Sequence, residues 1–240
     1  MRVVLVEPRD SRNVGAVARA MANFGFSDLR LVCPRDYDRE QAGVTARDSA
    51  PILDNAVIHQ SLADAIADVV DVVGFALRTG PSPARCTTLP DWAQRRAPVP
   101  TALVFGPEDD DLRHEHLDQC RWIVRIPSDA GFPSLNLAQS VLVALYELSR
   151  TAPHGFDLAE NQPAATERPD AGELAQLDRL IQQTMQRSGF VRPGSPRNAA
   201  RTIGTLLRRM DLDRSEAAAL TALFGRLDRA LERGGPSSET

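Results

Sequence analysis

The first 150 residues alternate between short runs rich in β-branched side chains and segments with helical spacing. In NVGAVARAMANFGF (13–26), Val14, Val17 and Met21 share one helix face, and Gly25 is placed to end the helix. Alternation of this kind predicts an α/β fold with a parallel sheet covered by helices on both faces. The strand-like runs are residues 2–8, 28–34, 69–77, 101–107 and 121–127, and the further helix-like segments are residues 61–68, 91–96 and 112–120.

Composition agrees with a soluble globular protein. Of 240 residues, 42% are hydrophobic and 25% are charged, and no apolar run is long enough to span a bilayer. The N-terminus enters a strand-like run at once, without the layout of a signal peptide. The cysteines Cys33, Cys86 and Cys120 are far apart and form no CxxC pair, which argues against a disulfide framework or a thiolate metal site. We expect a cytoplasmic protein without a membrane segment.

The C-terminal third has a different organisation. Residues 151–170 contain three prolines and no sustained period, which indicates a linker. Three helices are predicted after it: one over 173–189, one opened by Ser195-Pro196 over 197–210, and one capped by Asp213 and running to about Arg233. We therefore expect a main domain over 1–150, a linker over 151–172, a helical module over 173–233 and a tail over 234–240.

Charge also divides the chain. It contains no lysine, so every basic side chain apart from histidine is an arginine. Residues 1–150 hold 16 Arg against 20 acidic residues, whereas residues 173–233 hold 11 Arg against 7. A basic module attached to a mildly acidic body suggests a polyanion as a partner.

Two polar clusters carry weaker signals. His114 and His116 are two residues apart and diverge on a helix, so a solvated helix face is a better interpretation than a metal pair, and we expect no metal site. The stretch FGPEDDDL (105–112) packs four acids into one turn, for which a helix N-terminus is the simplest explanation. The chain contains neither GxGxxG nor GxxxxGK[ST], so nucleotide-phosphate sites of those kinds are unsupported.

Two other stretches are open to both a structural and a functional interpretation. In EPRDSRNVGAVARA (7–20), a polar loop follows a strand, Asn13 opens a helix, and Arg19 lies opposite the apolar face. Ligands of open α/β sheets gather at such strand ends, but a capped helix with a surface arginine gives the same pattern. In GFPSLNLAQSVLVALYE (131–147), Ser134-Leu135-Asn136 precedes an apolar helix, which fits either a helix cap or a binding site.

Three stretches taken together are more specific. NVGAVARAM, ALVFGPED followed by DL, and IPSDAGFPSLNLAQSVLVALYE occur in this order and resemble the three motifs of the SPOUT superfamily of RNA methyltransferases. The similarity is greatest to the TrmJ-type tRNA ribose 2′-O-methyltransferases, and the C-terminal segment resembles their helical extension. The resemblance implies a deep trefoil knot, a homodimer, S-adenosylmethionine as methyl donor and tRNA as substrate, methylated at nucleotide 32. Methylation of ribosomal RNA, or RNA binding without catalysis, stays open.

The resemblance also implies roles for single residues. Catalysis would fall to Asn13, Arg19, Ser134 and Asn136. The cofactor would be bound by Ala76, Leu77, Gly106, Glu108, Ile126, Ser134 and Leu135. Arg19 would bind the RNA phosphate beside the ribose. The clustering of arginines in the basic module, rather than the resemblance, favours RNA binding there as well, although an ordinary solvated helix surface stays open; these arginines are Arg192, Arg197, Arg201, Arg208 and Arg209.

The chain departs from the family pattern at three places in these motifs. Asp111 replaces a usual glycine, and it would be strained if the position required a positive φ. Pro133 replaces a common serine, and the loop at 75–77 is more apolar than usual. We expect such changes to affect cofactor affinity or substrate choice rather than the fold.

Overall fold

The computed structural model describes residues 1–77, 86–151, 168–190, 198–210 and 212–233. Within these residues the body is a seven-stranded sheet with the order β3-β2-β1-β6-β4-β7-β5, and every neighbouring pair is parallel. The predicted parallel sheet is therefore confirmed. The strands are β1 Arg2–Val6, β2 Asp28–Val32, β3 Val57–His59, β4 Asp71–Phe75, β5 Cys86–Thr88, β6 Thr101–Phe105 and β7 Trp122–Arg125.

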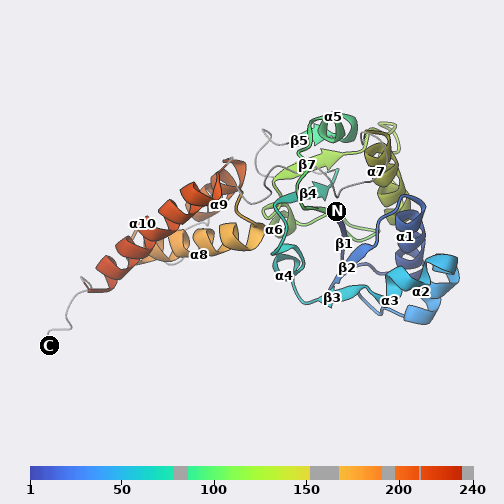
Figure 1. Cartoon of the computed structure of the whole chain (residues 1–240), viewed down its shortest axis with the longest axis horizontal. Coiled ribbons are helices and arrows are strands. Elements are labelled where there is room, and N and C mark those ends of the chain that lie inside the picture. The colour runs from blue at the N-terminus through green and yellow to red at the C-terminus, as the bar shows by residue number, and fades with distance from the viewer. Residues whose placement is uncertain (78–85, 152–167, 191–197, 211, 234–240) are drawn as a thin grey trace.

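Helices cover both faces of the sheet (Figure 1). The helices of the body are α1 Ser11–Asn23, α2 Arg39–Ala46, α3 Ala50–Asp54, α4 Leu62–Ile66, α5 Leu89–Arg95, α6 His114–Leu117 and α7 Leu137–Thr151, with a 3-10 turn η1 at Arg47–Ser49. Gly25 follows α1 with φ of +75°, a conformation that glycine adopts without strain, so the predicted end of this helix is confirmed.

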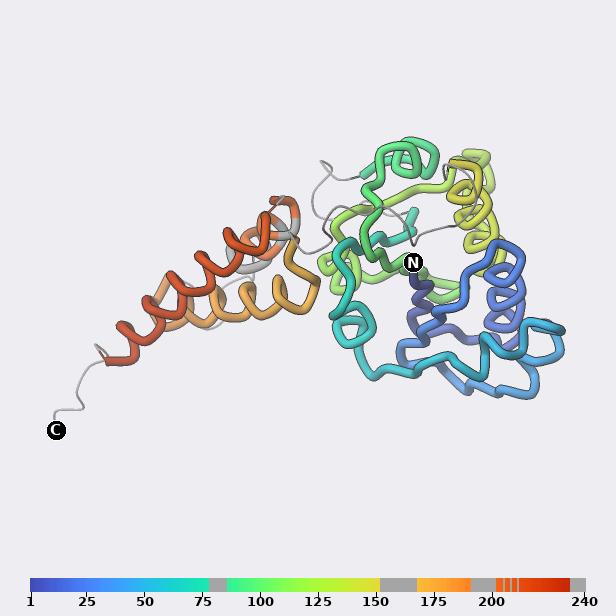
Figure 2. Tube along the Cα trace, viewed as in Figure 1, coloured from blue at the N-terminus to red at the C-terminus, as the bar shows by residue number. Residues whose placement is uncertain are grey.

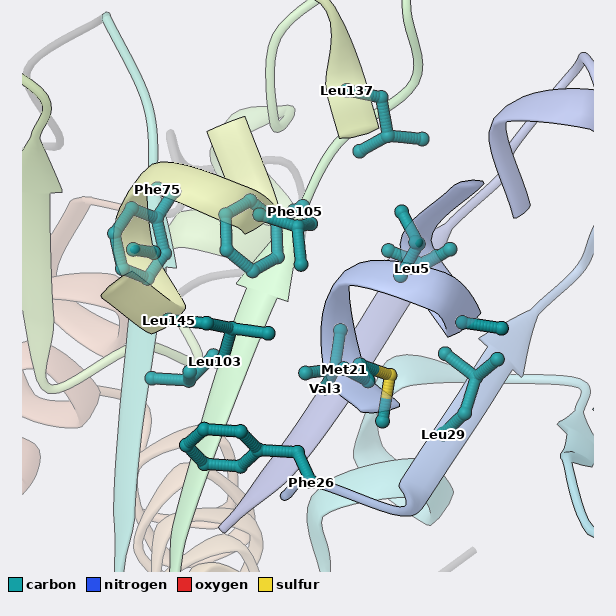
Figure 3. Close-up of a cluster of buried hydrophobic side chains, with 14 of the residues drawn as sticks. Val3, Leu5, Met21, Phe26, Leu29, Phe75, Leu103, Phe105, Leu137 and Leu145 are labelled. Atoms are coloured by element: carbon teal, nitrogen blue, oxygen red, sulfur yellow. The ribbon is translucent and has the colours of Figure 1, made fainter. Parts of the chain in front are cut away.

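Alternate strand residues build two separate cores. Val3 and Leu5 of β1 pack with residues of α1 and α7, and Figure 3 shows part of this cluster. Val4 and Val6 point to the other face and pack with α4 and with Leu117 of α6. Because β1 is buried on both faces, its sequence is a continuous apolar run rather than an alternating one.

The C-terminal helices α8 Ala171–Arg187, α9 Asn198–Arg209 and α10 Arg214–Arg233 form an arm on the α4 side of the body, with α8 and α10 packed along each other (Figure 2). The arm is anchored at its base, because the amides of Ala171 and Gly172 donate to the carbonyls of Val69 and Ala67 at 2.8 and 2.9 Å. The predicted cap at Asp213 is confirmed, since its carboxylate accepts the Glu216 amide at 2.7 Å.

Other predictions about this region are not tested. The predicted cap at Ser195-Pro196 lies outside the described residues. The first helix begins two residues before the predicted start of the module at 173. The division into domains and the knot both stay predictions.

Sequence patterns missed four elements of the body. Strands β3 and β5 have three residues each, and helices α2 and α3 have eight and five. Of the β3 side chains, Val57 and Ile58 are exposed at the sheet edge, so this strand has no alternating pattern to detect. In the part of the chain that the structure describes, no helix combines the length and apolarity that crossing a membrane would need.

Candidate active site

A pocket of about 440 Å³ opens at the carboxyl ends of β4, β6 and β7. Four segments line it: the end of β4 through Leu77, the loop after β6 from Phe105 to Asp111, the end of β7, and the start of α7 with the residues before it. The last two segments contribute Val124, Ile126, Pro133, Ser134, Leu135, Leu137 and Ser140. All seven residues predicted to bind a cofactor are among the lining residues. The strand ends bring them together, as expected for ligand sites of open parallel sheets. Paired across β4 and β6, Phe75 and Phe105 stack their rings 4.4 Å apart at this end of the sheet.

Glu108 connects the first motif to the second. Its carboxylate accepts the amides of Arg9 and Asp10 at 3.0 and 3.3 Å, and the side-chain amide of Asn13 at 3.0 Å. The loop after β1 and the start of α1 are thereby fixed against the pocket wall. Because its carboxylate accepts three hydrogen bonds, the main role of Glu108 is to connect the loop after β6 to the loop after β1.

Asn136 extends this network to the third motif. Its side-chain amide donates to the Asn13 side-chain oxygen at 3.1 Å, so a continuous hydrogen-bonded chain runs from Asn136 through Asn13 to Glu108. Its own side-chain oxygen accepts the Ala138 amide at 2.9 Å and caps α7. The cap therefore belongs to Asn136, whereas Ser134 lines the pocket.

Gly106 is required by a close approach. A Cβ at this position would lie 2.8 Å from the Leu112 backbone nitrogen, closer than real Cβ atoms approach backbone. The loop after β6 can therefore fold back on itself only with glycine here. Asp111, in the same loop, is not among the residues with positive φ, so the strain considered for it from the sequence is absent.

The acidic turn has a different setting from the one predicted. Helix α6 begins only at His114, so Glu108, Asp109, Asp110 and Asp111 lie in the loop before it and line the pocket. The helix N-terminus interpretation is wrong, because residues 108–110 form a separate turn, and the backbone of Arg113, directly before α6, is still extended. Of the pocket-lining residues that the structure describes, none is basic, so the cavity has an acidic rim.

The predicted solvated face of His114 and His116 is only half right. His114 is exposed, but His116 is buried, because α6 is a single turn that packs its Leu117 side against the sheet. Burial lowers the pKa of His116, and the nearby Arg113 lowers it further. Among the described residues, no group of three His, Cys, Asp or Glu side chains is placed to hold a metal ion.

Glu7 was not recognised from the sequence. It directly follows β1 and has a φ of +48°, and its carboxylate accepts hydrogen bonds from Arg113 and from Arg35, the latter at 2.6 Å. Burial raises the pKa of Glu7, but the two guanidinium groups outweigh this effect and hold the pKa below its usual value. Glu7 thus ties the ends of β1 and β2 to the loop that precedes α6. Its position directly after a buried strand was the available signal.

The remaining predicted residues are not gathered at the pocket. Arg19 is exposed on α1 and does not line the cavity. Of the module arginines, Arg209 is half-buried on α9. Arg192 and Arg197 lie outside the described residues, as do the side chains of Arg201 and Arg208.

Comparison with known proteins supplies the family. Residues 1–146 match the sequence profile of the SpoU rRNA Methylase family. The chain belongs to the SpoU methylase family. A relative from Pectobacterium atrosepticum, named tRNA (cytidine/uridine-2′-O-)-methyltransferase TrmJ, is 34% identical over 239 residues and covers 94% of each chain.

Two solved structures have a fold similar to that of this SpoU methylase. The crystal structure of TrmJ from Z. mobilis has a TM-score of 0.81 and 30% identity, covering 95% of this chain and 98% of that one. A structure described as giving insights into the 2-OH methylation of C/U34 on tRNA has a TM-score of 0.50 and 30% identity. It covers 62% of this chain and 94% of that one.

Proposed function

We propose that this protein is an S-adenosylmethionine-dependent methyltransferase that modifies the ribose 2′-hydroxyl of tRNA at nucleotide 32. The observation that carries the proposal is the pocket, whose lining includes every residue implied for cofactor binding. The relative from Pectobacterium atrosepticum, similar over nearly the full length of both chains, supports tRNA and the 2′-hydroxyl as targets.

The residues present fit the cofactor. A volume of about 440 Å³ lies within the range of small-molecule sites. The apolar side chains of Ala76, Leu77 and Ile126 offer a surface for a flat base, and their backbone carbonyls can accept hydrogen bonds from its edge. The acidic rim suits a ligand with net positive charge. When bound, S-adenosylmethionine would supply an electrophilic methyl group to the ribose 2′-oxygen; its sulfur would keep the electron pair of the broken bond, and the hydroxyl proton would pass to solvent water.

The protein's contribution to this transfer is mainly positioning. Asn13 and Asn136 are held by the Glu108 network beside the pocket, where we expect them and Ser134 to orient the ribose and its phosphate. Arg19 would bind that phosphate with two parallel hydrogen bonds and stabilise the developing alkoxide. A guanidinium stays protonated at neutral pH, so Arg19 acts as a cation rather than as a resting base.

We also propose that the helical module binds tRNA and that the protein is a homodimer. The net positive charge of residues 173–233 supports a role in binding tRNA phosphates, which gives affinity rather than sequence choice. An exposed apolar stripe on α7, formed by Leu142, Val143 and Tyr146, supports a homodimer through this face.

The test is transfer from methyl-labelled S-adenosylmethionine to unmodified tRNA and, separately, to ribosomal RNA, followed by mapping of the modified ribose. We expect a single 2′-O-methyl group at nucleotide 32 of tRNA. Modification at nucleotide 34 would move the target within the anticodon loop, and modification of ribosomal RNA alone would overturn the substrate. Cofactor binding without transfer to either RNA would overturn catalysis.

A further inference from the structure

Asp111 connects two walls of the pocket that the sheet leaves unconnected. Strands β4 and β6 are paired as far as Phe75 and Phe105, and beyond these residues the ladder ends. The carboxylate of Asp111 accepts the Leu77 amide at 2.8 Å with one oxygen and the Leu112 amide at 2.9 Å with the other. One side chain therefore spans the loops after β4 and β6.

Both loops belong to the cavity. Leu77 and Asp111 line it, and the absence of a side chain at Gly106 lets the backbone of Leu112 lie close to the start of the loop after β6. Nothing in this arrangement depends on Asp111 being strained, since its backbone has ordinary φ. Glycine, which usually occupies this position in the family that the motifs resemble, has no side chain that could accept a hydrogen bond from the Leu77 amide. The bond is thus a feature of this chain's own residue.

We propose that Asp111 is a positioning residue that fixes the backbone at Leu77 for cofactor binding. The inference rests on the proposed function, because it takes the pocket to be the cofactor site. Hydrogen bonds from amides to a carboxylate are among the stronger ones in proteins. Losing this bond should weaken S-adenosylmethionine binding by about tenfold, which corresponds to about 1.4 kcal/mol.

The experiment is calorimetric titration of the full chain with S-adenosylmethionine and with S-adenosylhomocysteine, its uncharged-sulfur product. The variants are Asp111→Asn, which keeps the shape and one oxygen, and Asp111→Gly. Asp48→Asn, an exposed residue of η1, is the matched control for loss of one carboxylate. Hydrogen exchange of the peptide containing Leu77 is measured on the same samples.

Positioning predicts that Asp111→Gly binds both ligands about tenfold more weakly and that its Leu77 amide exchanges faster. Asp111→Asn should lie between Asp111→Gly and the wild type, because its remaining oxygen can accept one of the two amides, and Asp48→Asn should match the wild type. If only the cationic S-adenosylmethionine is weakened and Leu77 exchange is unchanged, Asp111 acts through charge and the inference is wrong. Unchanged or tighter binding of both ligands also overturns it. A wild-type chain that binds neither ligand would overturn the proposed function itself, and so the two failures can be told apart.

Discussion

Arg2 is a buried arginine at the start of β1, far from the pocket. Its guanidinium donates to Asp28 at 2.8 Å, to the Ala65 carbonyl at 2.9 Å and to both carboxylate oxygens of Asp68. The hydrogen bonds from Arg2 lower the pKa of Asp68 to about 2. This cluster ties β1, β2 and α4 together at the amino end of the sheet.

The Asp68 pKa has a consequence for acid stability. A carboxyl whose folded pKa is depressed below the unfolded value of about 3.9 stabilises the fold above that pH, and the contribution is lost as pH falls towards 2. Because Asp68 is largely exposed, we expect it to contribute no more than about 1 kcal/mol. Urea unfolding at pH 5 and pH 3 should show a smaller loss of stability in Asp68→Asn than in the wild type. An equal loss in both proteins would contradict this assignment.

Arg19 gives a second test at the level of one residue. Lysine keeps the charge but cannot bind a phosphate with two parallel hydrogen bonds, so Arg19→Lys should lower the single-turnover rate by about tenfold to a hundredfold. Arg39→Lys, on α2 and paired with Asp54, is the control and should keep the wild-type rate. If Arg19→Lys retained both the full rate and the full RNA affinity, the proposed role of Arg19 would be wrong.

Single residues also show which contacts of the site could be predicted from the sequence and which could not. The sequence placed Asn13 and Glu108 each shortly after a strand, and the structure pairs those two strands and joins the two side chains by a hydrogen bond. No pattern in the sequence could show that Asp111 reaches Leu77, because that contact joins loops 34 residues apart. The burial of His116 was missed for a related reason, since a one-turn helix has too little periodicity to reveal its inner face.

At the level of elements, the contact between α1 and α2 depends on a missing side chain. A Cβ on Gly15 would lie 1.9 Å from the Ala42 carbonyl oxygen and 2.2 Å from the Thr45 hydroxyl oxygen. Thr45 also donates to the Arg12 carbonyl at 2.7 Å, so α2 is held against the first turn of α1. The helices pack this closely only because glycine occupies the contact.

Gly15→Ala should therefore destabilise the protein by about 1–3 kcal/mol, as overpacking does in other cores. Gly43→Ala is the matched control, because its added Cβ would meet only the flexible end of Arg39. Alanine also favours the helical conformation there, so we expect Gly43→Ala to be neutral or to stabilise by up to about 1 kcal/mol. Chemical denaturation measures both. Equal stability changes in the two variants would show that the close approach does not govern this contact.

Elements with sustained apolar patterns were predictable from the sequence. The five predicted strands and the long helices α1, α7, α8 and α10 have sustained apolar patterns. The edge strand β5, with the sequence CTT, offers no such pattern, and its pairing with β7 is decided by tertiary contacts.

At the scale of the whole molecule, the C-terminal arm can be deleted without removing the hydrogen bonds that join its base to the body. A chain ending at Gly172 keeps the amides of Ala171 and Gly172 bound to the body, while the charged helices are lost. We expect this variant to bind S-adenosylmethionine as the full chain does and to bind tRNA more weakly, with a reduced dependence on salt. Filter binding at several salt concentrations measures this, and undiminished tRNA affinity would exclude the arm as the tRNA-binding module.

The assembly can be tested through α7. Its inner side, which includes Val141, Leu145 and Leu148, is buried in the core, yet its outer side is apolar as well. On that outer side Tyr146 makes an edge-to-face contact with Phe24 beside α1, so the apolar surface continues beyond one helix. Stable dimers bury about 1,200–2,000 Å² in total, more than three side chains provide, so α1 should also belong to the interface.

Leu142, which is 41% exposed and belongs to the stripe, is the position at which a charge should separate two copies. A carboxylate buried in an apolar interface without a partner costs several kcal/mol, so Leu142→Glu should be monomeric where the wild type is dimeric. Val44→Glu is the matched control, since Val44 is 73% exposed on α2 and lies outside the stripe. Analytical ultracentrifugation distinguishes the two states. A dimeric Leu142→Glu would place the interface elsewhere, and a monomeric wild type would remove the second copy from the proposed function.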